Sequence, residues 1–453
     1  MSELKRTLNL QDAVSIVAGS MIGSGIFIVS TFIARIVNSG LLLIFVWLLA
    51  GLITMLGALC YGELSSTIPD EGGQYIYLKK IFSKKLAFLY GWTLFLVIQT
   101  GTLAAVNIAL AKFIGLIFPL INANNYLIKT AYYSLSTEQL FAIFVVIVLT
   151  FINSRGIKLG VLVQNIFTLT KILSIILIVI FGLFLGFHLS VLKANLFIPF
   201  ILNFETIKLL MISITGALFA SITWNNVTFI TSEIKHPRKN IKKALFIGVG
   251  IVVCLYCLLN FIYLGVLPLE LIKTSPQDIV AAQLAQQIFG QKALYIIAVV
   301  IAVSAFGCAN GMILTGARVY YKMAKDRIFF RKLAYIDRKT RTPKNSLWLQ
   351  CFWICILVLW GNYAQLLDYV IYSSIIFYTI TIFGIFRMRK LYSNEKNIFK
   401  VPNFIPIAFI VLSSTIILSL SILKPLTTLP GLIITFLGIP VYFFWNKTSC
   451  KDS

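Results

Sequence analysis

The apolar run of residues 10–37 carries the tripeptide Gly23-Ser24-Gly25 at its centre. A run of this length can cross a lipid bilayer, for which about 20 helical residues suffice. Glycine and serine weaken a helix, and a backbone group that loses its helical hydrogen bond in hydrocarbon is costly unless it finds a new partner. We therefore expect a membrane helix broken in its middle, with backbone amides of its second half free to bind an anionic group. The alternative is that these small residues only let two helices pack closely.

The remaining chain consists of similar apolar runs, which are typical of an all-α integral membrane protein. Of its 453 residues, 59% are hydrophobic and 12% are charged, whereas about 25% of the residues in a soluble domain are charged. The lipid bilayer is therefore expected to surround most of the molecule. The net charge of +24 comes from basic residues in the links between runs. The positive-inside rule explains this excess, so no nucleic acid partner is expected.

Few residues are suited to hold a metal ion. The two histidines, His188 and His236, are far apart, and the Cys-x-x-Cys spacing of Cys254 and Cys257 lies inside an apolar run without a second pair. We expect neither a metal nor a cofactor. No carboxylate pair and no nucleophile with a nearby base stands out at membrane depth, so the sequence does not predict an enzyme.

Twelve membrane spans are expected. Their approximate bounds are 10–37, 41–67, 86–119, 138–153, 159–187, 207–232, 241–267, 291–323, 345–361, 364–388, 403–423 and 428–446. Basic residues are concentrated at both ends of the chain and in every second link. This places both termini on the cytoplasmic side of the cytoplasmic (inner) membrane. No cleavable signal peptide is expected before the first span.

The sixth span contains a second interruption, in the stretch from Gly216 to Asn226. Ser221, Thr223, Asn225 and Asn226 bring polar side chains to the middle of a span, where they are costly unless they face a site or a partner helix. An interhelical hydrogen bond is the alternative role for the two asparagines. Interrupted helices at matching positions of two halves predict an inverted-repeat transporter with its substrate near the midplane.

Three of the ionisable residues within spans or at their ends are candidates for a specific role. Lys171 is well inside the fifth span, where an ammonium group must reach the interface, pair with backbone carbonyls or lose its proton. We expect a functional cation held against the broken first span, which could also carry a proton. Both a gate or loop-anchoring ion pair and an ordinary solvated carboxylate fit Glu63, at the end of the second span. Glu233, which ends the sixth span, is expected to form a salt bridge.

Several stretches resemble those of one known family. They are Met21–Phe27, Pro69–Leu78, Leu89–Trp92, Gln164–Lys171, Trp224–Asn226, Glu233–Pro237, Ser304–Gly311, Ala317–Asp326 and Thr342-Pro343. Between about residue 8 and residue 390 the chain resembles amino acid permeases of the amino acid–polyamine–organocation superfamily, with the L-amino-acid-transporter-like branch nearest. The resemblance implies two inverted five-helix repeats, residues 1–190 and 205–390, followed by two helices within residues 400–453.

The resemblance also implies a substrate site between the two interrupted spans. The backbone amides of Ser24 and Gly25 would bind the substrate carboxylate, and carbonyls near the breaks would bind its amine. Phe219 would act as an aromatic lid, and Asn225 would lie close to the substrate backbone. The expected substrate-binding residues are Met21, Ile22, Gly23, Ser24, Gly25, Phe219, Ser221, Ile222, Thr223 and Asn225.

The implied function is secondary active transport of an amino acid by alternating access. Lys171 would fill the place that sodium takes in sodium-coupled relatives, which implies sodium-independent transport and leaves exchange and proton coupling open. Ile222-Thr223 replaces the small glycine-rich pair common in the family, so we expect small neutral substrates. The alternatives are a membrane sensor that binds amino acids with little transport, and a permease for cationic amino acids or polyamines.

Overall fold

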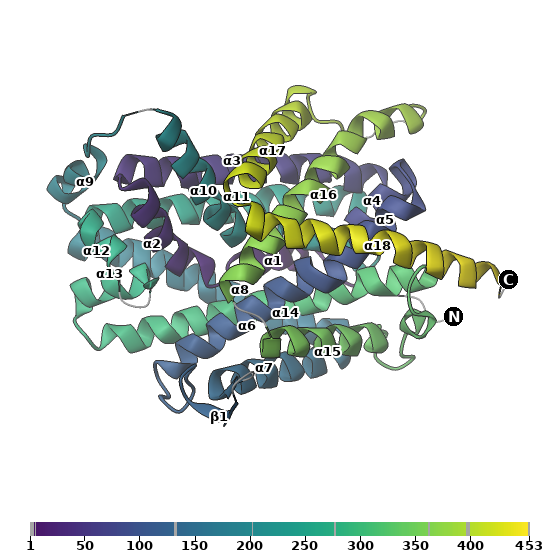
Figure 1. The fold of residues 1–453 in the computed structure, drawn as a ribbon, viewed down its shortest axis with the longest axis horizontal. Helices are drawn as coiled ribbons and strands as arrows, with labels where there is room; N and C mark the ends of the chain where they lie inside the picture. The colour runs from purple at the N-terminus through teal and green to yellow at the C-terminus, as the bar shows by residue number, and fades with distance from the viewer. Residues whose placement is uncertain are drawn as a thin grey trace.

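The computed structural model describes residues 4, 6–130, 134–201, 203–275, 278–360, 363–395 and 399–451. Within these residues the fold is helical apart from one small hairpin, in which β1 (Tyr126–Lys129) pairs antiparallel with β2 (Ser134–Ser136). Most long helices run along the long axis of the molecule, and both termini lie at one end of it (Figure 1). We call this the terminal end and the other the opposite end.

Eleven segments of the described chain are long and apolar enough to cross a bilayer. They are formed by α1 (Leu10–Met21) with α2 (Gly25–Val37), α3 (Gly40–Thr67), α5 (Lys84–Thr93) with η1 (Leu94–Ile98) and α6 (Gln99–Gly115), α7 (Thr137–Ser154), α8 (Ile157–Phe181) with η2 (Gly182–Gly186), α10 (Phe204–Ala220) with η3 (Trp224–Glu233), α11 (Pro237–Val266), α14 (Ala293–Lys325), α16 (Tyr363–Leu391), α17 (Phe404–Leu423) and α18 (Pro425–Lys451). The predicted all-α membrane fold is confirmed.

The ninth expected span, 345–361, corresponds to α15 (Lys344–Trp360). This helix is apolar but has 17 residues, so it is about 26 Å long, whereas the hydrocarbon core is about 30 Å thick. It lies at the lower limit for a spanning helix. The count of exactly twelve spans therefore stays a prediction, and so does the division into two repeats.

Short helices cover the two ends of the long ones. At the opposite end lie α9 (Leu189–Leu196), α12 (Leu269–Lys273) and α13 (Val280–Phe289), whereas α4 (Gln74–Ile81) lies toward the terminal end (Figure 1). The helix η5 (Arg331–Ala334) belongs to the link between α14 and α15.

Local sequence signals set where the first helix begins. The side chain of Asn9 accepts a hydrogen bond from the backbone of Asp12, and the Asp12 carboxylate accepts one from the backbone of Asn9, both at 2.9 Å. This reciprocal cap satisfies amides that a helix start leaves unpaired. From there α1 runs into the interior, packed against α8, α11, α14 and η3. The broken first span is thus central in the fold.

The link between α14 and α15 is ordered by one carboxylate. The backbone amide of Thr340 donates to Asp337 at 2.8 Å, and the Lys344 ammonium lies 3.0 Å from the same side chain. These contacts favour the charged form, so the pKa of Asp337 lies well below its usual range, the Thr340 amide being the largest cause.

Candidate functional site

Both predicted helix interruptions are present. The helix α1 ends at Met21, Ile22 is extended (φ −74°, ψ 97°), and α2 begins at Gly25. The second break follows Ala220, at the end of α10. There Thr223 adopts the left-handed conformation (φ 70°, ψ 0°), and η3 begins at the next residue. Bulky residues rarely adopt this conformation, so the strain at Thr223 must be offset by its surroundings.

The two breaks lie directly against each other. The Thr223 hydroxyl donates to the carbonyl of Ser20 at 2.8 Å, which supplies one compensating contact. A Cβ atom on Gly25 would lie only 2.8 Å from the Cβ of Ala220, so a glycine is needed for the close approach of α2 and α10. The hydroxyl of Tyr256, on α11, lies 3.1 Å from both the Met21 and the Ala220 carbonyls. Tyr256 therefore joins the ends of α1 and α10, which are the first halves of the two broken spans.

A small cavity, which we call the break cavity, lies between the two interruptions; together with the open space next to it, it contains about 290 Å³ not filled by atoms. It is lined by Ser20, Met21, Gly23, Ser24, Gly25, Thr102, Val106, Phe219, Ala220, Ile222, Thr223 and Cys308. None of these described lining residues is charged. The cavity is therefore suited to a small ligand whose charges are bound by backbone groups.

Seven of the ten expected binding residues line the break cavity, and three do not. Ile22 is fully buried and its carbonyl faces Lys171, as described below. Ser221 lines a different cavity, and its hydroxyl donates to the Ala217 carbonyl at 3.0 Å. Asn225 lies in a second cavity, described next.

The second cavity, of about 300 Å³, shares Thr102, Ile222 and Thr223 with the break cavity. Its other lining residues are Gln74, Tyr90, Leu94, Ile98, Gln99, Asn225, Asn226, Phe229, Ser374 and Tyr378. The Asn225 amide donates to Gln74 at 3.2 Å, and the Tyr378 hydroxyl donates to Asn225 at 3.0 Å. Asn225 thus makes the interhelical hydrogen bonds that were the alternative interpretation of its position.

Several cavity-lining residues were missed by the sequence analysis. Thr102 and Val106 lie on α6, and Cys308 on α14 has its sulfhydryl 2.8 Å from the Ser20 carbonyl. A threonine or cysteine in an apolar helix is common, so only the Ser304–Gly311 motif, which contains Cys308, drew attention to this part of α14. Tyr256 likewise lies in an ordinary apolar span.

Lys171 is fully buried and lies against the first break. Its ammonium donates to the carbonyls of Gly19 at 2.6 Å, Ile22 at 2.7 Å and Ser304 at 3.2 Å. No carboxylate among the described residues forms an ion pair with it. Of the three expected ways to accommodate this lysine, the structure shows pairing with backbone carbonyls. The ammonium is thus held by two carbonyls at the first break and one on α14.

Two ion pairs with a buried carboxylate connect helices toward the terminal end of the molecule. The Arg389 guanidinium donates to both oxygens of Glu63, at 2.6 and 2.7 Å, and the Val401 amide donates to the same carboxylate at 2.8 Å. Glu63 is fully buried, so the prediction of an ion pair is correct and the alternative of a solvated carboxylate is wrong. The expected salt bridge of Glu233 is also present, with Arg318 at 2.9 Å.

The chain before α1 is joined to the chain after η3. The backbone amides of Thr7 and Leu8 donate to the Glu233 carbonyl at 2.9 and 3.0 Å, and the Lys235 amide donates to the Leu8 carbonyl at 2.8 Å. This forms a parallel bridge between Leu8 and Ile234. The two half-helices on the terminal side of the breaks are thus held together at their far ends.

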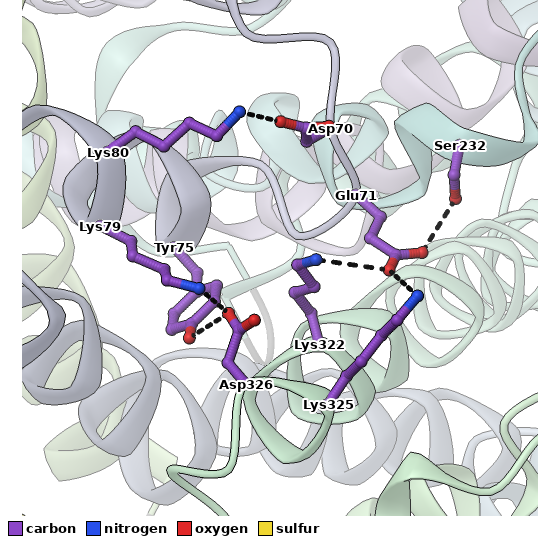
Figure 2. Close-up of polar contacts among 9 residues, drawn as sticks. All are labelled: Asp70, Glu71, Tyr75, Lys79, Lys80, Ser232, Lys322, Lys325 and Asp326. Atoms are coloured by element: carbon purple, nitrogen blue, oxygen red, sulfur yellow. Dashed lines mark hydrogen bonds and ion pairs between the residues drawn. The ribbon is translucent and has the colours of Figure 1, made fainter.

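A cluster of polar contacts joins α4 to the last turn of α14 (Figure 2). Asp326 lies 2.7 Å from the Lys79 ammonium and accepts a hydrogen bond from the Tyr75 hydroxyl at 2.8 Å. Burial, and then the nearby carboxylate, raise the pKa of Tyr75 far above its usual range, so it remains a donor. Lys79 and Asp326 are only 22% and 13% exposed. This pair is better shielded from water than an ordinary surface pair.

The cluster continues to the end of the sixth span. Glu71 lies 3.7 Å from both Lys322 and Lys325 on α14, and the Ser232 hydroxyl donates to it at 3.3 Å (Figure 2). We call Glu71, Tyr75, Lys79, Ser232, Lys322, Lys325 and Asp326 the terminal-end network. It links the chain after α3, the end of η3 and the end of α14. The Lys80–Asp70 pair in the same view is more than 40% exposed on both sides.

Comparison with known proteins identifies relatives along nearly the whole chain. A family model described as amino acid permease matches residues 8–444. The large neutral amino acids transporter small subunit 2 of Oryctolagus cuniculus is 30% identical over 99% of this chain and 82% of its own length. The Asc-type amino acid transporter 1 of Homo sapiens is 29% identical, over 99% and 84%. The b(0,+)-type amino acid transporter 1 of Mus musculus is 28% identical, over 98% and 90%.

Proposed function

The chain belongs to the amino acid permease family, and we propose that it is a sodium-independent secondary transporter of small neutral amino acids. The observation that carries this proposal is the meeting of two helix breaks around one uncharged cavity. The first amides of α2 have no partner within the helix and bear the positive end of its dipole, which suits a carboxylate. The ends of α1 and α10 present carbonyls, which suit an ammonium group. A free amino acid carries both charges.

The proposed substrate class follows from the side chains around the cavity. Ile222, Phe219 and Val106 are apolar and narrow the space beyond the two breaks. Because the described lining holds no carboxylate or cation, a charged substrate side chain would have no partner there. Alanine and serine fit this chemistry better than lysine or tryptophan.

The proposed independence from sodium rests on Lys171. Its ammonium already donates to three carbonyl oxygens, two at the first break and one on α14, so a sodium ion would have to compete with a covalently attached cation. Transport would then use either exchange of one amino acid for another or a proton carried by Lys171. The printed name of one relative refers to large neutral amino acids.

Alternating access requires that each end closes in turn. In this structure the terminal-end network and the Glu63–Arg389 pair lie between the cavities and the terminal end. Binding of substrate across both breaks would draw the half-helices together, and release would require these contacts to separate. The free energy of the network therefore sets how often the terminal end opens.

The test is uptake of labelled alanine into proteoliposomes, with and without unlabelled amino acid inside, at two pH values and with or without sodium. Uptake that needs internal amino acid supports exchange. Uptake into empty vesicles that rises with an inward proton gradient supports proton coupling. Uptake that requires sodium, or binding without any uptake, contradicts the proposal.

Two variants sharpen this experiment. Lys171→Met removes the cation with little change in length and should abolish coupled uptake, whereas Lys158→Met, near the start of the same helix, is the matched control. Ile222→Gly should widen the cavity and admit larger neutral substrates in a competition panel. If the unaltered protein already prefers tryptophan or leucine, the proposed substrate class is wrong.

A further inference from the structure

A large apolar crevice opens beneath α13, between the opposite-end halves of α8 and α14. It contains about 1000 Å³ of space not filled by atoms. Eleven of its thirteen lining residues are apolar, and the exceptions are Ser174 and Lys292. The hydroxyl of Ser174 already donates to the Thr170 carbonyl at 2.8 Å. The crevice is separate from the break cavity, with which it shares no lining residue.

The crevice faces the hydrocarbon of the bilayer. Leu177 on α8, Phe289 on α13 and Ile296 on α14 line it and are 49%, 52% and 66% exposed. Of an apolar 18-residue stretch within the span formed by α8 and η2, only 28% is buried inside the protein. Since lipid surrounds such a span, its neighbours are acyl chains rather than water. An apolar space of this size would be filled by lipid in the membrane.

One charge lies at the end of the crevice. Lys292 stands at the junction of α13 and α14, at the opposite end of the molecule, and is exposed. Within the described part of the chain it forms no hydrogen bond or ion pair, in contrast to Lys273, which bonds Glu270 and Asn38. The crevice thus combines a long apolar body with a single unpaired cation at the membrane surface, which is the complement of an anionic amphiphile.

The dimensions of the crevice match one leaflet. The lining residues of α8 extend from Ser174 to Phe181, eight residues of helix or about 12 Å, and half of the hydrocarbon core is about 15 Å. The rings of Phe181 and Phe289 meet edge to face, with centroids 5.4 Å apart, and join α8 to α13 at the end near Lys292. An acyl chain could lie along α8 below this ring pair while its headgroup reaches the lysine.

We propose that the crevice binds one acyl chain of an anionic glycerophospholipid, with the lipid phosphate on Lys292. The site belongs to the leaflet at the opposite end and is independent of the transported substrate. Its occupant lies between the opposite-end halves of α8 and α14, which farther along carry Lys171 and its carbonyl partner Ser304. Filling the crevice therefore supports the spacing of these two helices.

The test is native mass spectrometry of the purified full chain, titrated with phosphatidylglycerol or phosphatidylcholine of identical acyl chains. The first phosphatidylglycerol should bind about fivefold more tightly than phosphatidylcholine, and Lys292→Gln should remove this difference. Lys193→Gln is the matched control, because Lys193 lies on α9 at the same end and does not line the crevice. This control should bind both lipids as the unaltered protein does.

Two further variants test the crevice itself. Ala285→Phe fills it from α13, and Ile296→Trp fills it from the lipid side without disturbing the core; each should weaken binding of both lipids by about tenfold. If either Ala285→Phe or Ile296→Trp folds and still binds both lipids as the unaltered protein does, the proposed location is wrong. Equal affinity of Lys292→Gln and the unaltered protein for phosphatidylglycerol overturns the headgroup contact. Displacement of phosphatidylglycerol by stoichiometric oleate overturns the assignment to a glycerophospholipid.

Discussion

Replacing Asp326 by asparagine should open the terminal end of the molecule. Asparagine keeps the size of the side chain and can still accept the hydrogen bond from Tyr75, but it loses the charge that attracts Lys79 at 2.7 Å. Hydrogen bonds to charged groups contribute about 1.5–3 kcal/mol, and we take about 2 kcal/mol for this partly solvated pair. Because every 1.4 kcal/mol is tenfold, the population with this end open should rise by about 30-fold.

The native Cys308 offers a reporter for this opening. It lines the break cavity and is only 4% exposed, so a thiol reagent reaches it only when a path opens. The measurement uses a variant in which the other cysteines are replaced, with a charged methanethiosulfonate reagent applied from the terminal side. Labelling of Cys308 should accelerate by about 30-fold in Asp326→Asn when the reagent is dilute. Opening and closing are then fast relative to labelling, so the labelling rate follows the open population.

The matched control is Asp70→Asn in the neighbouring Lys80–Asp70 pair. Both of these side chains are more than 40% exposed, and exposed pairs contribute about 0–1 kcal/mol, so labelling should change by less than about fivefold. Lys79→Met removes the other partner of the shielded pair and should act like Asp326→Asn. If Asp326→Asn labels Cys308 no faster than Asp70→Asn, the shielded pair does not hold this end closed.

Three further outcomes are expected. Glu63→Gln leaves Arg389 without its counter-charge and should lower the free energy of unfolding by about 3–5 kcal/mol, measured by denaturant or thermal unfolding. Gly25→Ala places a Cβ 2.8 Å from that of Ala220, so α2 must shift and alanine affinity in uptake assays should fall about 10- to 100-fold. Asp337→Asn should lower the melting temperature above about pH 5, and this difference should shrink below about pH 4, because a carboxylate with a depressed pKa loses its stabilising contribution as it is protonated.

Matched controls separate these effects from general damage. Gly250→Ala also adds a methyl group to a helix glycine, but the nearest atom would lie 3.6 Å away, so alanine affinity should not change. The double variant Glu63→Met with Arg389→Met removes both charges and should recover much of the stability lost in Glu63→Gln. A double variant no more stable than Glu63→Gln would show that the two side chains act independently. An Asp337→Asn effect that is the same at all pH values would rule out the charge as its cause.

The central features of the candidate site could be predicted because each departs from its local surroundings. Glycine, serine and asparagine stand out in apolar runs, and the structure has both helix breaks at those places. Lys171 stands out for the same reason, since a buried ammonium must have partners. In each case the physical cost of the residue in hydrocarbon is the signal, and that cost can be read without knowledge of the fold.

The partners of these residues could not be predicted in the same way. Tyr256 and Cys308 lie in apolar helices whose local pattern is ordinary, and only the packing of α11 and α14 brings them to the breaks. The choice between two roles for Glu63 depended on Arg389, which is 326 positions away in the chain. Such pairings are set by how the helices pack, and a single sequence does not reveal them.

The bridge between Leu8 and Ile234 has a mechanical consequence. It fastens the start of α1 to the end of η3, so the two half-helices have one shared displacement rather than two independent ones. A displacement of the chain at Thr7 would then be transmitted to the sixth span through these hydrogen bonds and not through the cavity. Any contact that holds Thr7 or Leu8 in place would thereby restrain both half-helices at once, although it touches neither break.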